Sequence, residues 1–306
     1  MPTPNFCLNS IMKQGNKIIV ILGPTASGKS DAAIRLARKF DGEIISADSR
    51  QIYRGMDIGS GKVTKAEQKL AKHWMLDIIS PKTSFSAGQF KKKADKIISD
   101  ILKRGKIPIV CGGTGFWIKA IVDNVEFPEV KPDWKLREKL SKKSTEKLFQ
   151  QLEKLDPERA KTVDPKNKVR LIRAIEIAKS LGKVPEIKSE PKYNALQIGI
   201  DMPKEKLHKR IEVRLEKRFQ QGMIKEVKKL HKQGVSWKRL ESFGLEYRWI
   251  ALYLQKKISK EEIKEKLLQE IKNYAKRQMT WFQKDERIFW LKNYKQIEKK
   301  ARKFLK

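Results

Sequence analysis

The stretch from Lys17 to Ser30 reads KIIVILGPTASGKS and decides the fold. Its first six residues form a β-branched run typical of a buried parallel strand, and DAAIRLARKF from Asp31 has the periodicity of a helix. The turn between them fits G-x-x-x-x-G-K-[ST], in which backbone N–H groups and a helix N-terminus hold a phosphate. We predict that a di- or triphosphate group binds this turn, with Lys29 as a cation and Ser30 as a ligand of Mg²⁺. The predicted phosphate site consists of Gly23, Pro24, Thr25, Ala26, Ser27, Gly28, Lys29 and Ser30.

The loop alone does not select a reaction. A kinase, a GTPase and a transferase with a diphosphate leaving group all need such a site. A glycine-rich turn that binds nothing is the alternative without function, and the flanking strand and helix argue against it.

Strand-like and helical runs alternate from Lys17 to Pro128. After the first strand come EIISA at 43–47, MLDII at 75–79 and KIPIVC at 106–111, with predicted helices between them. This alternation is typical of a parallel sheet with helices on both faces. We therefore predict the P-loop NTPase-like α/β class.

Strands stop at about Glu129, and the chain to Glu190 is a helical block with proline and glycine breakers. ALQIGIDM at 195–202 returns to a strand, so the block is an insertion into the α/β core. After Pro203 the pattern is almost wholly helical and Lys-rich. We expect three parts, namely a first part of the core at 1–128, a helical insertion at 129–190, and a last core strand with a basic helical part at 191–306.

The composition favours a polyanionic partner. Among 306 residues, 70 Lys and Arg face 36 Asp and Glu, which gives a formal net charge of +34. A Lys-rich proteome is the other explanation of this excess. The two cysteines, Cys7 and Cys111, cannot supply a disulfide framework or a thiolate zinc site. Because no apolar run is long enough for a membrane span and no signal peptide is recognisable, we expect a cytoplasmic protein, and we expect it to be a monomer.

Asp48 follows the predicted strand at 43–47, at the sheet edge where ligands collect in open α/β folds. In a kinase this carboxylate would bind Mg²⁺, and in a transferase it could take a proton from the acceptor. The alternative without chemistry is that it only caps the following turn. Thr114 follows the predicted strand at 106–111 in a GGTG turn, which is either a part of the same site or a plain connection. Arg210 and Arg214 share one helix face, for which a solvated basic surface is the alternative on spacing alone.

Several blocks in order resemble the tRNA dimethylallyltransferases, also called tRNA isopentenyltransferases. The similar blocks are GPTASGKS at 23–30, ADSRQIYRGMDIG at 47–59, GGTGFW at 112–117, VRLIRAIE at 169–176, RIEVR at 210–214 and YAKRQMTWF at 274–282. Two segments depart from the family pattern. Ser60-Gly61-Lys62 stands where an Ala-Lys-Pro ending is usual, and Gly244-Leu-Glu-Tyr-Arg248 is a variant of the family's Gly-Tyr-Arg segment.

The resemblance implies transfer of a dimethylallyl group from dimethylallyl diphosphate to N6 of adenosine 37 in tRNA, next to the anticodon, with diphosphate as the second product. It implies Asp48 as the base, with Thr114 and Arg214 at the reacting groups. The helical insertion would clamp the anticodon stem-loop. The tRNA contacts implied in this way are Asp48, Ser49, Arg50, Gln51, Thr114, Arg137, Val169, Arg170, Leu171, Ile172, Arg173, Arg248, Arg277 and Gln278.

Aromatic side chains could stack on splayed bases of an RNA loop. The candidates are Phe116, Trp117, Tyr247, Trp281 and Phe282. Since adjacent positions on a helix face different ways, we expect at least one of Trp281 and Phe282 to be buried instead.

Three other functions are alternatives to a tRNA-modifying transferase. A small-molecule kinase would explain the loop and a helical lid, but not the basic C-terminal part. A non-catalytic RNA-binding module leaves Lys29 and Asp48 without a role. A prenyltransferase for free adenine nucleotides has no use for the VRLIR and RQMTW segments, because a free nucleotide has no stem to grip. We therefore expect a tRNA-modifying transferase whose RNA binding weakens steeply with salt.

Overall fold

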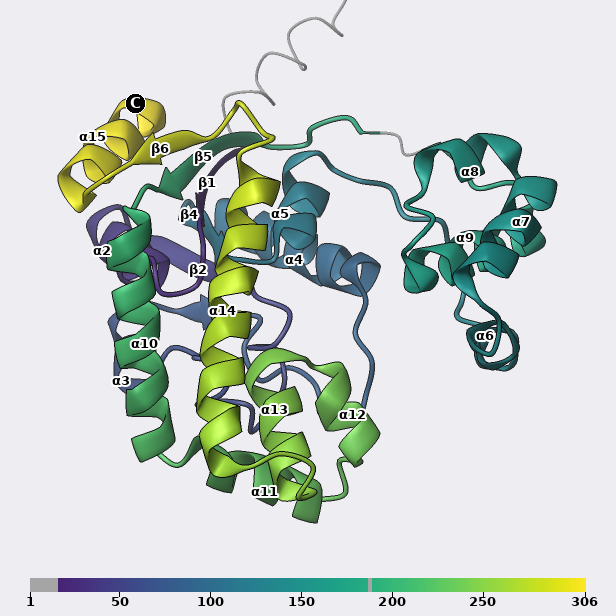
Figure 1. The fold of residues 1–306 in the computed structure, drawn as a ribbon. Helices are drawn as coiled ribbons and strands as arrows, with labels where there is room; N and C mark the ends of the chain where they lie inside the picture. The colour runs from purple at the N-terminus through teal and green to yellow at the C-terminus, as the bar shows by residue number, and fades with distance from the viewer. Residues whose placement is uncertain (1–15, 187–188) are drawn as a thin grey trace, which may run out of the picture. The chain divides into compact units, whose positions relative to one another are not determined.

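The computed structural model of the protein describes residues 16–186 and 189–306, so Cys7 and most of the segment searched for a signal peptide lie outside the described residues (Figure 1). The chain forms two compact units. The core unit comprises residues 16–124 and 191–306, and the helical unit comprises Val125–Glu190. The helical unit begins a few residues before the insertion expected at 129.

A six-stranded sheet of order β3-β2-β4-β1-β5-β6 forms the centre of the core unit, and every neighbouring pair is parallel. The predicted α/β class with a parallel sheet is therefore confirmed. The strands are β1 (Lys17–Leu22), β2 (Gly42–Ala47), β3 (His73–Trp74), β4 (Ile107–Gly112), β5 (Asn194–Ile200) and β6 (Phe289–Leu291).

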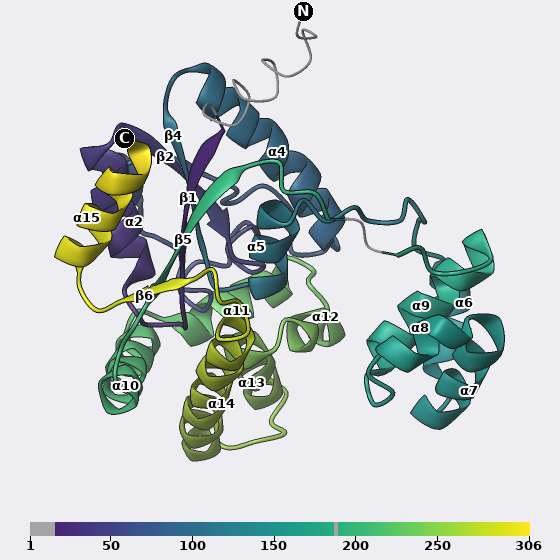
Figure 2. The same cartoon turned by 90° about the horizontal axis from the view of Figure 1, so that it is seen from above.

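Both faces of this sheet are covered, which explains why β1 is apolar at successive positions instead of alternating. Ile18, Val20 and Leu22 pack into one hydrophobic cluster, and Ile19 and Ile21 pack into the other. Figure 2 shows the first helix after the phosphate loop together with the C-terminal helix on one face, and the helices before and after β4 on the opposite face.

The helices of the core unit are α2 (Lys29–Lys39), α3 (Lys65–Leu70), α4 (Ala87–Lys103), α5 (Gly115–Val122), α10 (Lys204–Gln220), α11 (Met223–Lys232), α12 (Trp237–Ser242), α13 (Leu245–Leu254), α14 (Lys260–Phe282) and α15 (Tyr294–Leu305). Helices α10 to α14 pack together beyond the carboxyl ends of the strands (Figure 1). α15 packs against α2 and the edge strand β6.

The helical unit contains α6 (Trp134–Ser141), α7 (Thr145–Leu155), α8 (Pro157–Thr162) and α9 (Lys168–Leu181) around a small core of its own. Asp156 caps α8 by accepting the N–H of Arg159, with Pro157 at the first helical position. The Asp-Pro signal in the sequence thus marks the start of a helix as well as a break.

Two details of the sequence-based prediction were wrong. The run MLDII at 75–79 is not a strand of the sheet, because Met75 and Asp77 have φ of 65° and 55°, outside the extended region, and β3 lies just before it. The helical prediction after Pro203 missed β6, which has only three residues and therefore shows no period of its own. The helix expected to begin near Asp31 is α2, which starts two residues earlier, at Lys29 inside the phosphate motif.

No helix among the residues that the structure describes is long and apolar enough to cross a membrane.

The buried carboxylate of Glu43 on β2 allows a stability test. It pairs with Arg104, and that hydrogen bond holds the pKa of Glu43 at about 2, against an ordinary value of 4.5. Because the folded-state pKa is depressed, the charged carboxylate stabilises the fold above pH 4.5, and this contribution is lost as the pH falls from 4.5 toward 2.

We expect Glu43→Gln to lower the free energy of unfolding by about 2 kcal/mol at pH 7, and the deficit to narrow between pH 5 and pH 3. Thermal or urea unfolding across this pH range measures it. Glu212→Gln, which removes an exposed carboxylate on α10, serves as the control and should leave the pH dependence unchanged. A Glu43→Gln deficit that is constant with pH would contradict the assignment.

Candidate active site

Three turns meet at the carboxyl edge of the sheet. They follow β1, β2 and β4, and β4 lies between the other two strands. The turn after β4 is tied to the turn after β2, because the Thr114 N–H donates to the Ala47 carbonyl at 3.2 Å and Thr114 Oγ1 accepts the Ser49 N–H at 3.1 Å. The structure therefore brings Thr114 and Asp48 to the same edge as the phosphate loop, as the sequence predicted.

The phosphate loop is wound tightly, with positive φ at Gly23, Ala26 and Gly28. Lys29 Nζ donates to the Pro24 carbonyl at 3.1 Å and so closes over the loop. Burial, together with the guanidinium of Arg214, lowers the pKa of Lys29. An anion bound in the loop would relieve this penalty, since it would give the buried ammonium an opposite charge.

Gln278 on α14 joins two of the three turns. Its Oε1 accepts the Thr25 N–H at 2.8 Å, and its Nε2 donates to the Gly113 carbonyl at 2.9 Å. Gly113 and Gly115 allow this close approach, because a Cβ on either would lie within 2.3 Å of the Gln278 and Trp281 side chains respectively. The sequence predicted Gln278 as a tRNA contact, whereas in this structure both ends of its amide bind the protein.

The Asp48 carboxylate is fixed by its own turn. Oδ1 accepts the backbone N–H of Arg50 at 2.9 Å and that of Gln51 at 3.4 Å. Capping and chemistry were alternatives in the sequence. The geometry joins them, because one oxygen caps the turn while the side chain lines the cavity beside Lys29 and Ser30.

The side chains of Arg50 and Gln51, in the same turn, are held by hydrogen bonds to other parts of the protein. Arg50 donates through Nε to the Phe243 carbonyl at 2.8 Å, which connects the turn to the end of α12. The Gln51 amide accepts from Ser46 Oγ and donates to the Gly61 carbonyl, both at 3.3 Å.

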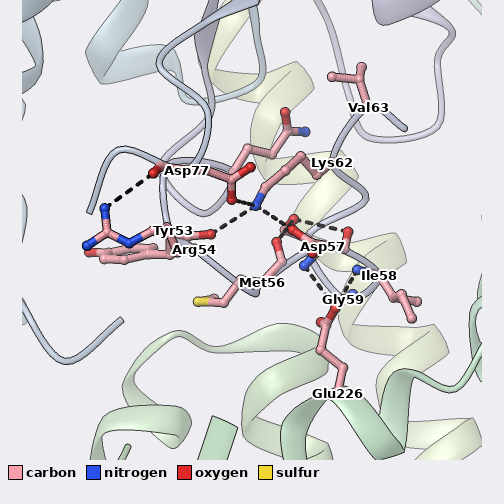
Figure 3. A network of polar contacts seen from close by, with 12 residues as sticks. Tyr53, Arg54, Met56, Asp57, Ile58, Gly59, Lys62, Val63, Asp77 and Glu226 are labelled. Carbon is pink, nitrogen blue, oxygen red and sulfur yellow. Dashed lines mark hydrogen bonds and ion pairs between the residues drawn. The ribbon is translucent and has the colours of Figure 1, made fainter. Parts of the chain in front are cut away.

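The loop Asp57–Lys62 is clamped by two opposite charges (Figure 3). The Glu226 carboxylate accepts the backbone N–H groups of Asp57, Ile58 and Gly59 at 2.9, 2.7 and 3.1 Å. The buried ammonium of Lys62 binds Asp57 and Asp77 and the Tyr53 carbonyl. This clamp fixes the Gly61 carbonyl, which accepts from Gln51 and from Arg214.

Arg214 lies on α10 with its NH2 group 3.3 Å from the Gly61 carbonyl. Burial, followed by the like charge of Arg218, lowers its pKa to about 10, so it stays protonated at neutral pH. Arg210 lies one turn earlier and approaches the phosphate loop at Gly28. The shared face of Arg210 and Arg214 is therefore directed at the loop and is not only a solvated surface.

One cavity gathers much of the predicted site. Its wall includes Thr25, Lys29, Ser30, Asp48, Arg50, Gln51, Arg214 and Gln278, and also Arg218, Glu246 and Tyr274, which the sequence analysis did not single out. Arg218 continues the spacing of four that begins at Arg210, so a signal for it existed. Glu226 is far along the chain from the loop that it contacts, and no motif in the sequence around it predicts that contact.

Other predicted tRNA contacts lie outside this cavity. Arg277 is exposed on α14, and Arg248 is exposed on α13, where it pairs with Glu270. In the helical unit Val169 and Arg170 are exposed and Ile172 is half-buried. The prediction for the Leu171 side chain needs correction, because that residue is fully buried in the core of the helical unit.

Arg137 and Arg173 of the helical unit both bind the buried carboxylate of Glu176, which their hydrogen bonds keep ionised with a lowered pKa although burial opposes this. Their charge is thus partly compensated within the unit.

The aromatic candidates divide by burial. Trp117 and Tyr247 are core residues and cannot stack on a base, which corrects that expectation. Phe282 is buried and Trp281 is 40% exposed, so the expectation that one of the two packs inside is confirmed. Phe116 is 43% exposed.

Several oxygen-bearing side chains lie close to Ser30, the residue predicted to bind Mg²⁺. Ser30, Ser46, Asp48 and Gln51 line a small cavity behind Lys29, and Mg²⁺ prefers such hard ligands. Among the described residues no group of three or more His, Cys, Asp or Glu side chains could hold a metal ion. The donor set therefore fits an ion held mainly by substrate phosphates and water, with Ser30 as the protein ligand.

An anion loop and a fixed carboxylate on one sheet edge place the chain in the class of phosphate-loop α/β enzymes. A family model described as IPP transferase matches residues 51–285. The chain belongs to the IPP transferase family.

The sequences of relatives align with this chain over almost its full length. A tRNA dimethylallyltransferase of Acetivibrio thermocellus is 41% identical over 286 residues, which is 90% of this chain and 91% of the relative. A second tRNA dimethylallyltransferase, from Syntrophus aciditrophicus, is 43% identical, and the aligned region is 90% of this chain and 93% of that relative.

Solved structures share the fold. The full-length tRNA isopentenylpyrophosphate transferase of Bacillus halodurans has a TM-score of 0.73 at 32% identity, with 95% of this chain and 97% of that chain covered. A eukaryotic dimethylallyltransferase acting on tRNA has a TM-score of 0.76 at 28% identity, with 87% and 69% covered.

The bridge made by Gln278 leads to a binding test. Gln278→Ala would leave the half-buried Thr25 N–H and the buried Gly113 carbonyl without this partner and free the phosphate loop to move. We expect the affinity for inorganic diphosphate in Mg²⁺ to fall about tenfold, as measured by calorimetry, because the loop is no longer held in its binding conformation. Gln283→Ala, at the exposed end of α14, is the control. Equal affinity in wild type and Gln278→Ala would show that the bridge does not organise the loop.

Proposed function

We propose that this chain transfers the dimethylallyl group of dimethylallyl diphosphate to N6 of adenosine 37 in tRNA, giving N6-(dimethylallyl)adenosine and diphosphate. The observation that carries the proposal is the anion loop with the Asp48 carboxylate at one sheet edge, in a chain of the IPP transferase family. The named relatives and the tRNA-acting structural neighbour support the substrate. We further propose that the protein acts as a monomer in the cytoplasm.

The acceptor nitrogen needs help because its lone pair is delocalised into the adenine ring. N6 attacks C1 of the allylic donor, and the C–O bond breaks with its electron pair passing to the diphosphate. Asp48 takes the proton from N6, since its carboxylate is held in place by two backbone N–H groups. Thr114, bonded to the same turn, fixes the position of this carboxylate relative to the loop.

The leaving diphosphate gains negative charge as the bond breaks, so fixed positive groups lower the barrier. Lys29, Arg214 and the backbone N–H groups of the phosphate loop supply them. Both cations are half-buried and their pKa values are lowered, which means that an incoming diphosphate meets charges poorly compensated by the protein.

Mg²⁺, when bound with the diphosphate, supplies additional charge neutralisation for the leaving group. Ser30 would hold it from the protein side.

Recognition of the RNA needs the target base turned out of the anticodon loop, at a cost of a few kcal/mol. The exposed Arg277 on the core unit, and the exposed Val169 and Arg170 on the helical unit, are proposed contacts to the anticodon arm. Lys and Arg contacts to phosphates make this binding salt-dependent.

One incubation tests the function directly. The protein, unmodified tRNA, Mg²⁺ and radiolabelled dimethylallyl diphosphate should give label in the tRNA at adenosine 37. ATP with a labelled γ-phosphate should give none. Phosphorylation of a small molecule or hydrolysis of ATP, with no prenylated tRNA, would favour the kinase alternative.

Asp48→Asn preserves the oxygen that caps the turn but removes the base. We expect turnover to fall by roughly a hundredfold or more while the tRNA dissociation constant stays close to that of wild type. Single-turnover prenylation and a filter-binding assay measure the two quantities. Asp41→Asn, at an exposed site after α2, should change neither. Unchanged turnover in Asp48→Asn would remove this residue from the role of base.

Lys29→Ala removes the ammonium over the phosphate loop. We expect the KM for dimethylallyl diphosphate to rise at least tenfold, because a buried charge-assisted contact to the diphosphate is lost, with no change in tRNA affinity. Lys39→Ala at the other end of α2 is the matched control. A Lys29→Ala defect confined to tRNA binding would argue against the donor site.

A further inference from the structure

Arg218 is a buried guanidinium in the wall of the cavity that contains Lys29, Asp48 and Arg214. Its side chain is 9% exposed, and its NH1 group binds Glu246 Oε1 at 2.7 Å. It follows Arg214 by four residues on α10, so both side chains leave the helix on the same face.

Gly61 makes room for the two arginines. A Cβ built at this position would lie 1.8 Å from Arg218 NH2 and 1.9 Å from Arg214 NH2, and Gly61 has a φ of 62°. Any other residue here would have to displace at least one guanidinium. The backbone of the clamped loop and the two arginines therefore fit one another.

Glu246 supplies the opposite charge. Its side chain is 6% exposed, and it lies in the first turn of α13. Both segments that depart from the family pattern in the sequence, 60–62 and 244–248, thus meet at Arg218. One provides the space for the guanidinium and the other provides its carboxylate.

The cavity remains cationic after this pairing. Lys29, Arg50, Arg214 and Arg218 line it with four positive charges against the two carboxylates Asp48 and Glu246, a formal excess of two. Such an excess suits an anion of several charges, and a diphosphate is one.

We propose that Arg218, admitted by Gly61 and held by Glu246, is a second guanidinium of the diphosphate site that acts beside Arg214. This inference rests on the proposed function, because it takes the donor diphosphate as the anion. The positive charge of Arg218 also contributes to the lowered pKa values of Lys29 and Arg214, so it raises the potential at both groups expected to meet the diphosphate.

A role in binding and a purely structural role make different predictions. If the Arg218–Glu246 pair only stabilises the fold, removing either partner should affect the protein in the same direction. If Arg218 acts on the diphosphate, removing the cation weakens binding, whereas removing the carboxylate leaves the cation in place and does not weaken it.

The test is calorimetric titration of the full chain with inorganic diphosphate in Mg²⁺ at fixed ionic strength. We expect Arg218→Gln to weaken binding about tenfold or more, since a charge-assisted contact is lost, and Glu246→Gln to bind at least as tightly as wild type. Lys217→Met removes one exposed positive charge from the adjacent position on α10 and should change the affinity less than twofold. The tRNA dissociation constant should be the same in all four proteins.

A second pair of variants covers the case in which Arg218→Gln does not fold. Arg218→Met combined with Glu246→Gln leaves no buried charge unpaired, and it is compared with Glu246→Gln alone, which retains Arg218. We expect the combined variant to bind diphosphate about tenfold more weakly.

The outcomes separate this inference from the proposed function. The role of Arg218 would be overturned if the combined variant and Glu246→Gln bound diphosphate equally. It would also be overturned if Glu246→Gln lost as much diphosphate affinity as Arg218→Gln. Wild-type protein that binds no diphosphate and prenylates no tRNA would overturn the proposed function instead.

Discussion

Parallel pairing of β1 with β4, and of β4 with β2, is the constraint on which the site depends. It places the carboxyl ends of three strands at one edge, so that a phosphate loop, a carboxylate and a threonine from residues 23 to 114 lie together. The antiparallel alternative would direct the β2 turn to the other edge. Everything that α10 and α14 add is built against this edge, beginning with the amide of Gln278.

The fold could be predicted well because its signals are local. The apolar run at 17–22 and the glycine spacing of the loop each specify an element without knowledge of the rest of the chain. Where the prediction failed, a local signal was absent or misleading. The run at 75–79 is as apolar as a strand, but two of its residues adopt positive φ to let the chain turn back toward the Tyr53 segment. β6 is defined only by its partner β5.

The sequence predicted which residues gather at the site better than it predicted how they are held there. Lys29, Asp48, Thr114 and Arg214 follow from motifs, and the structure places them around one sheet edge. What the sequence could not give is which polar side chains serve the protein itself. Gln278 and Gln51 were both predicted as tRNA contacts, yet Gln278 binds backbone groups of Thr25 and Gly113, and Gln51 binds Ser46 and the Gly61 carbonyl. The partners of Gln278 lie more than a hundred positions away along the chain, and those of Gln51 are brought to it only by the folded turn.

The hydrogen bonds between Glu226 and the loop at 57–59 limit how the sequence of that loop can change. The carboxylate accepts the main-chain N–H groups of 57–59 and the hydroxyl of Tyr247, so its hold on the loop does not use the side chains at those three positions. Two of the three positions are constrained by other contacts. The Asp57 carboxylate binds Lys62, and a Cβ at Gly59 would lie 2.8 Å from the ring of Tyr247. The path of this segment is therefore set by one acid and the aromatic ring bonded to it, and substitutions are restricted at Asp57 and Gly59 more than at the position between them.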